Sequence, residues 1–192
     1  MLNRSCFVFP LLSLLAGCAS LAPTVSRSDQ ADARSGYVAG LFSRSGMSFA
    51  LVIRSTDGQR EYVMPMGEDT RWPARLTDST TAIRVAPGTY AVSEWFTYAT
   101  VTKETISRVP NDVETLNRPF TVEAGSVTHL GQFLVESQRI RTADRRVLRY
   151  HMRVHPVPAA APAILDSFAR AYPGLASQRI KCLPCGGSLA PE

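Results

Sequence analysis

Cys182 and Cys185 have the spacing that most directly predicts a chemistry, because a Cys-x-x-Cys pair either cycles between thiol and disulfide or binds a metal. In a redox enzyme the first cysteine of such a pair begins a helix after a strand, whereas two glycines follow this pair. The chain has no second Cys-x-x-Cys to complete a zinc site. We therefore expect a local disulfide formed in an oxidising compartment, with a redox or metal-handling role as the alternative.

Positive charge gathers in one short segment near the end of the chain. Six arginines lie between residues 139 and 153, with Asp144 as the single acid among them. Because a guanidinium forms paired hydrogen bonds with phosphate and carboxylate, the segment predicts contact with an anion or with an acidic partner. The alternative is an ordinary solvated face, since arginine is the usual cation of this chain. The six residues are Arg139, Arg141, Arg145, Arg146, Arg149 and Arg153.

Two tryptophans are candidates for contact with a partner or a carbohydrate. Trp72 lies in a polar stretch between Gly67 and Thr81, and Trp95 lies in a predicted strand. Trp95 and Phe96 are consecutive, so in a strand they point to opposite faces, and one of them lies outside the core unless something covers it. The alternative is that these aromatic side chains fill the core and its ends.

The three histidines do not predict a metal site. His151 and His155 are four residues apart in one predicted strand, which separates them by about 13 Å, and His129 belongs to another strand. The sequence also lacks the G-x-S-x-G, H-E-x-x-H and phosphate-binding glycine motifs of common catalytic sites. We expect a protein that is not an enzyme and that needs no cofactor.

The N-terminal residues have the order of a secretory signal: Arg4, an apolar run from Cys6 to Leu15, and small residues before Cys18. The segment LAGC that ends at Cys18 resembles the lipobox of bacterial lipoproteins. The resemblance implies acylation of Cys18 and, because Ala19 rather than an aspartate follows, placement in the outer membrane facing the periplasm. Several acyl chains anchor a protein durably. An ordinary signal peptide with a chance cysteine is the alternative.

One globular domain must position these residues. The chain has 192 residues, of which 45% are hydrophobic and 19% are charged, a composition typical of a single domain with tails. Residues 1–17 are the expected signal peptide. Residues 18–35 are the lipidated cysteine and a flexible tether, because they are small and polar. Residues 36–158 are the expected β-domain, residues 159–175 a C-terminal helix, and residues 176–192 a tail with the cysteine pair.

From residue 36 onward apolar and polar residues alternate with the two-residue period of half-buried strands. Asp57-Gly58, Pro87-Gly88 and Ala124-Gly125 are turn signals between the strands. About seven to nine short strands with frequent turns predict an all-β fold of two packed antiparallel sheets. The segments are 37–41, 49–53, 60–64, 82–85, 89–98, 101–109, 120–122, 127–135 and 148–155.

One helix is predicted near the C-terminus. Pro162 suits its first turn, and Ile164, Leu165, Phe168 and Tyr172 lie on one face at helical spacing. We expect this helix to lie across the sandwich or to cover an open end. The tail from Ser177 is expected to be a loop.

The order of the motifs resembles that of small bacterial outer-membrane lipoproteins with a transthyretin-like, or carboxypeptidase-regulatory-like, β-sandwich. The resemblance lies in the segment APGTYAV at 86–92, the segment FTVEAG at 120–125 and the pair Leu130-Gly131, and it extends to Asp166 and Tyr172-Pro173 in the helix. His129 stands where those proteins often have a tyrosine. The resemblance implies a transthyretin-like fold over about residues 36–175 and no particular function.

These features predict a non-enzymatic lipoprotein that serves as a binding or scaffolding module in the cell envelope. Its expected partners are the membrane, through the lipid anchor, and another envelope protein or lipopolysaccharide. The alternative function is binding of an anionic envelope glycan or lipid through the arginine-rich face. We do not expect nucleic acid as a partner, despite the net charge of +5, because an anchored periplasmic protein does not meet it.

Overall fold

The computed structural model describes residues 24–44, 48–66, 77–98, 105–141, 148–185 and 187–189. The expectations for the signal peptide and for Cys18, Trp72, Arg145 and Arg146 lie outside these residues. Of the described helices, none is long and apolar enough to cross a membrane.

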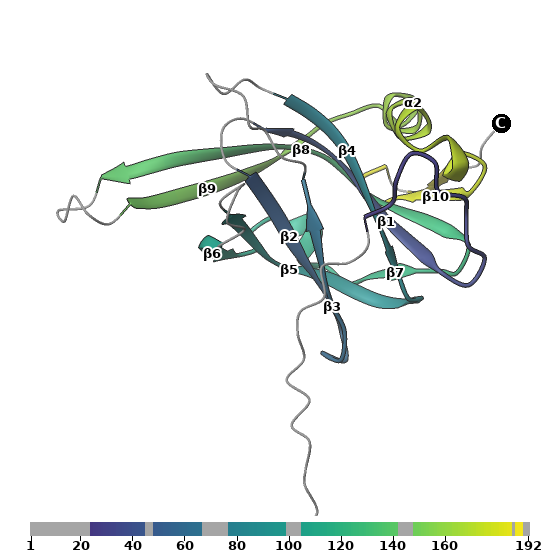
Figure 1. The fold of residues 1–192 in the computed structure, drawn as a ribbon, viewed down its shortest axis with the longest axis horizontal. Helices are drawn as coiled ribbons and strands as arrows, with labels where there is room; N and C mark the ends of the chain where they lie inside the picture. The colour runs from purple at the N-terminus through teal and green to yellow at the C-terminus, as the bar shows by residue number, and fades with distance from the viewer. Residues whose placement is uncertain are drawn as a thin grey trace, which may run out of the picture.

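The described residues form an all-β structure of two sheets with one longer helix, as the alternating pattern predicts (Figure 1). The strands are β1 (Gly36–Arg44), β2 (Ser48–Ser55), β3 (Glu61–Pro65), β4 (Thr77–Val85), β5 (Gly88–Tyr98), β6 (Thr105–Pro110), β7 (Phe120–Val122), β8 (Ser126–Arg141), β9 (Leu148–Val157), β10 (Arg179–Cys182) and β11 (Gly187–Leu189). The helices are α1 (Glu114–Asn117), α2 (Ala161–Ala171) and the short 3-10 helix η1 (Pro173–Leu175).

The smaller sheet is antiparallel throughout. Its order is β3-β2-β5-β6, with β7 pairing with β5 beside β6. The β2–β3 hairpin turns at Asp57-Gly58, where Gly58 has a φ of 71° that suits glycine. The sequence predicts this turn.

The larger sheet is mixed, which corrects the expectation of two antiparallel sheets. Its order is β11-β10-β8-β1-β4, with β9 pairing with β8 beyond the end of β10. Strand β8 runs parallel to both β1 and β10. Between β1 and β8 the chain forms β4 and all the strands of the smaller sheet, and between β8 and β10 it forms β9, α2 and η1. Both parallel pairs therefore have the long connection that parallel pairing needs.

The main core lies between the two sheets and is built from large side chains of both. Phe42 and Phe133 of the larger sheet stack at 5.8 Å, and Trp95 of the smaller sheet packs against Phe133 at 6.2 Å. Leu51 and Ile53 are fully buried beside them. Because side chains alternate between the two faces of a strand, each sheet has one apolar face, and the two apolar faces pack together as in other β-sandwiches.

A second core covers the outer face of the larger sheet. Phe168 lies in α2 and Tyr172 directly follows it. Both pack against Tyr37 and Ala39 of β1. The hydroxyl of Tyr172 accepts a hydrogen bond from the amide of Ala82 at 2.9 Å, which ties the helix to β4. The predicted helix and its buried face are confirmed, and the helix covers a sheet face rather than an open end of the sandwich.

Residues 24–35 pack against the domain, which corrects the expectation of a flexible tether for this part of residues 18–35. Thr24 forms a β-bridge with Ile83 on the edge of β4, and Val25 is buried in the second core. The amide of Asp32 donates to the Tyr37 hydroxyl at 2.7 Å. One buried valine and a few backbone hydrogen bonds hold a segment whose composition is otherwise that of a linker.

The segment after Ser177 is a strand rather than a loop, which corrects a second expectation. Strand β10 pairs with the start of β8, so that Ile180 lies opposite Val127 and joins the second core. Strand β11 pairs with β10 and is the edge strand of the sheet. A single buried isoleucine in a four-residue strand leaves too short an alternation to be recognised in the sequence.

Candidate functional site: a projecting hairpin and the groove at its base

The β8–β9 hairpin extends beyond the sheet that supports it. Pairing of β8 with β1 ends at the pair Val135–Arg44, whereas pairing of β8 with β9 continues to Arg141–Leu148. We call residues 136–141 of β8 and 148–153 of β9 the arm. Figure 1 shows it as a two-stranded ribbon that projects past the rest of the molecule.

The arm contains four of the six arginines predicted to contact an anion or a partner. The register pairs Arg139 with Tyr150, Arg141 with Leu148 and Arg149 with Ile140, so these arginines are not directly opposite one another. Arg153 is exposed and lies opposite Glu136. Like charges directly opposite destabilise a ribbon, so this register tolerates a high density of arginine.

A groove of about 500 Å³ lies at the base of the arm. One wall is Arg153 to Pro156 of β9, and the other is Asp112 to Thr115, which follows β6 and includes the first two residues of α1. His155 is half exposed, and its Nε2 lies 3.9 Å from a carboxylate oxygen of Glu136. The groove therefore has a basic wall and an acidic wall.

Asn111 holds the acidic wall in place. Its Oδ1 accepts hydrogen bonds from Trp95 Nε1 at 2.7 Å and from the Val113 amide at 3.1 Å. Its Nδ2 donates to the Val92 carbonyl at 3.1 Å and to Asn117 Oδ1 at 2.8 Å. Trp95 is fully buried, which favours the alternative that it fills the core over contact with a partner. It supports the groove through its hydrogen bond to Asn111.

Phe96 lies on the opposite face of β5 from Trp95, as the consecutive pair predicts. With Ala50, Val63 and Tyr98 it forms a small apolar cluster on the outer face of the smaller sheet. The guanidinium of Arg108 lies 5.7 Å from the centre of the Phe96 ring.

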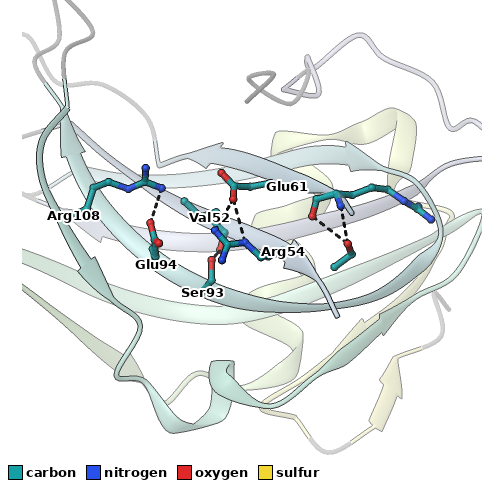
Figure 2. A network of polar contacts seen from close by, with 8 residues as sticks. Val52, Arg54, Glu61, Ser93, Glu94 and Arg108 are labelled. Atoms are coloured by element: carbon teal, nitrogen blue, oxygen red, sulfur yellow. Dashed lines mark hydrogen bonds and ion pairs between the residues drawn. The ribbon is translucent and has the colours of Figure 1, made fainter. Parts of the chain in front are cut away.

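Two ion pairs join strands of the smaller sheet (Figure 2). Arg108 contacts Glu94 at 2.5 Å and Arg54 contacts Glu61 at 2.7 Å, on neighbouring strands of the smaller sheet. Ser93 donates to the Val52 carbonyl at 3.4 Å beneath them. These four charges are paired with one another, which leaves the arm as the better candidate for attracting an ionic partner.

The cysteine pair forms a disulfide at the end of β10. Its loop lies over Gly131, where β8 has a β-bulge. Before this bulge β8 pairs with β10, and after it β8 pairs with β9. A Cβ on Gly131 would lie 2.9 Å from Pro184 Cγ, and the φ of Gly131 is 117°. The disulfide loop is thus packed on a specific irregularity of the sheet.

His129 is buried beside this loop, in register with Cys182. Its Nδ1 accepts a hydrogen bond from the Gly131 amide at 3.1 Å, so the proton of the neutral ring is on Nε2. Nε2 has no hydrogen-bond partner among the residues that the structure describes, and the ring meets Phe168 edge to face at 6.3 Å. Burial lowers the pKa of His129 to about 4, so it is neutral at physiological pH.

Within the described ranges no three His, Cys, Asp or Glu side chains are placed to hold a metal ion. Of the predicted site residues, the structure brings Arg153 to the groove and Arg139, Arg141 and Arg149 to the arm. Sequence reasoning missed Asp112, Glu114 and the groove itself, because the two walls are far apart in the sequence. The Asn-Asp-x-Glu segment after β6 was the available signal.

No protein-family model matches this chain, and no curated protein matches it. Among solved structures, the chain is similar to a leucine-rich repeat protein from Bacteroides thetaiotaomicron VPI-5482, with 16% sequence identity and a TM-score of 0.35. The match covers 53% of this chain and 12% of that chain, so it spans a small part of that protein's length. A likeness of this size supports no statement about fold or function.

Proposed function

We propose that this protein is a non-enzymatic outer-membrane lipoprotein, anchored through Cys18 and facing the periplasm, that binds another envelope protein through the arm and the groove. The anchor rests on the lipobox-like segment that ends at Cys18. The binding role rests on the projecting hairpin. The transthyretin-like relationship stays a proposal that rests on the sequence motifs alone.

The observation that carries the binding role is the two-stranded part of β8 and β9. Among the described strands, β9 is the only one that pairs with β8 beyond Val135. A two-stranded hairpin is marginally stable in water, and its outer edges present backbone groups that another chain can pair with. A ribbon of this kind with closely spaced arginines is suited to contact with an acidic partner.

The groove favours a protein over a polyanion as the partner. Arg153 and His155 lie on one wall, and Asp112 and Glu114 lie on the other. A phosphate-rich glycan or lipid would meet the two carboxylates as it approached the base of the arm, whereas a protein segment can present both signs of charge. Binding of an anionic envelope glycan or lipid, such as lipopolysaccharide, is the second candidate and rests on the arm arginines alone.

The test is photo-crosslinking in living cells from position 136, which is exposed at the base of the arm. We compare the wild type with the variant R139Q/R141Q/R149Q. The control variant R54Q/R108Q/R170Q removes the same charge outside the arm and the groove. We expect one stoichiometric protein adduct that the arm variant loses and the control keeps.

Two other outcomes have definite meanings. An adduct with lipopolysaccharide that the arm variant loses would replace the scaffold by the glycan or lipid binder. Equal crosslinking by all three proteins would overturn the role of the arm.

A further inference from the structure

The docked N-terminal segment limits how far the domain can stand from a membrane anchor. The amide of Val25 donates to the Ala82 carbonyl at 3.0 Å, and the Val25 side chain is 6% exposed. The same segment fits closely against η1, because a Cβ on Gly174 would lie 2.1 Å from the Asp29 carbonyl oxygen. The chain is therefore fixed to the domain from Thr24 onward.

Only a short length of chain joins this fixed point to Cys18. Thr24 is the sixth residue after Cys18. In any conformation, six residues span at most about 22 Å, since a fully extended chain covers about 3.6 Å per residue. With Cys18 acylated in the bilayer, Thr24 lies within that distance of the lipid headgroups.

Thr24 lies near the end of the larger sheet that is opposite the arm. It bridges to Ile83, which pairs with Val38, and Val38 pairs with Thr128 of β8. Strand β8 then continues in one direction to Arg141. At about 3.3 Å per residue, the thirteen residues from Thr128 to Arg141 place the far part of the arm roughly 43 Å from the level of Thr24.

Several turns gather at the same end as Thr24. Gly36 pairs with Val85, and the Gly125 amide donates to the Ser35 carbonyl at 2.8 Å. The β2–β3 turn is beside them, because the Thr56 amide donates to the Thr89 carbonyl at 3.0 Å. We call the turns 56–59, 86–88 and 123–125 the near end.

We propose that the near end faces the lipid bilayer and that the arm points away from it into the periplasm. The proposal rests on the lipid anchor of the proposed function. The connection of about 22 Å is half the length from Thr24 to Arg141, so an arm pointing down into the bilayer would need more chain than residues 19–23 supply. From Val25 to Thr24 the chain also runs toward the Val85 end of β4, which is the direction of the near end.

The orientation separates the two ligands that the arginines could meet. Anionic lipid attracts cations within about a Debye length, roughly 8 Å in physiological salt. With the near end on the bilayer, the arm arginines lie well beyond that range of the leaflet that holds the anchor. Their partner is then in the periplasm rather than in the same leaflet.

The experiment measures energy transfer from a dye on the full-length acylated protein to an acceptor lipid in vesicles of phosphatidylethanolamine and phosphatidylglycerol. The dye is attached to Q59C in the near end or to E136C at the arm; both positions are exposed. The disulfide and the acylation leave the introduced cysteine as the reactive thiol. We expect stronger transfer from position 59 than from position 136, which lies about 26 Å farther along β8 from the level of Thr24.

A longer connection is the matched control. An insert of about 30 Gly and Ser residues after Ser20 adds a coil of roughly 30 Å, and we expect it to abolish most of the transfer from position 59. Equal transfer from both positions, or greater transfer from position 136, would overturn the orientation while leaving the anchor intact. The mass of the N-terminal peptide tests the anchor separately, and an unmodified Cys18 would overturn the anchor and the orientation together.

Discussion

The indole N–H of Trp95 donates to the side-chain oxygen of Asn111 at 2.7 Å, and this buried hydrogen bond joins the core of the sandwich to the acidic wall of the groove. Asn111→Ala removes the acceptor of Trp95 and of the Val113 amide, and the donor to the Val92 carbonyl. Each buried group left unsatisfied costs about 1–3 kcal/mol, so we expect a loss of roughly 3 kcal/mol in the free energy of unfolding by urea.

Asn117→Ala is the control for that change. Among the described residues it removes one side-chain hydrogen bond, to Asn111 Nδ2, and Asn117 is exposed. We expect a loss of about 1 kcal/mol or less. Equal losses for the two variants would contradict the central role of Asn111.

His129 predicts a specific dependence of stability on pH. Its pKa is about 4 in the folded protein, against 6.5 for an ordinary histidine. The unfolded chain therefore binds more protons between these two values, and stability falls as pH decreases through that window. The full effect is on the order of 3 kcal/mol and is complete below pH 4.

The measurement is the free energy of unfolding above pH 6.5 and just above pH 4, for the wild type and for His129→Gln. We expect the variant to lose markedly less stability over this interval, because glutamine does not titrate. The same loss in both proteins would show that other groups account for the acid sensitivity.

Gly131 is held in a conformation and a space that only glycine fits. Gly131→Ala places a Cβ against the rigid ring of Pro184 at a φ of 117°. We expect a loss of about 2 kcal/mol in unfolding free energy. The matched control is Gly58→Ala, where φ is 71° and, apart from its chain neighbours, no described residue lies within 4 Å of the new Cβ. A control as destabilised as the variant would contradict the role of the Pro184 contact.

The disulfide is expected to order the C-terminal strands rather than to hold the whole fold. Its loop is short, so Cys182→Ser/Cys185→Ser costs about 2 kcal/mol or less by loop entropy. Amide hydrogen exchange should rise in β10 and stay unchanged in β2 and β5. Unchanged exchange in β10 would contradict this role. A lost cellular phenotype in a variant that keeps its fold would support the redox alternative.

Local sequence patterns predicted most of the strands and the helix, because alternation and helical spacing act over a few residues. Phe49, Leu51 and Ile53 alternate toward the core as expected, and the pair Trp95–Phe96 points to two faces. Ile164 and Phe168 are buried at helical spacing. These elements can be predicted without knowing which other segments they pack against.

The features that the sequence did not predict depend on distant contacts. Tyr37 lies in a strand that is covered on both faces, and nothing local shows that Val127 is its parallel partner. The docking of residues 24–35 depends on the burial of Val25 and on the lack of a side chain at Gly174. In the sequence, Val25 lies in a segment with the composition of a linker, and Gly174 has the position of a residue that ends a helix. The groove combines β9 with the loop after β6, so its charge pattern exists only in the folded protein.

The parallel pairing of β1, β8 and β10 has a consequence for how the chain folds. Strand β1 pairs with β8 only after the whole smaller sheet has been synthesised, and β10 comes later still. Contacts between such distant segments give a high contact order, which slows folding. Until β8 arrives, one edge of β1 is open to pairing with other chains, which is the common route to aggregation. Folding therefore depends on keeping that edge of β1 protected until β8 has paired with it.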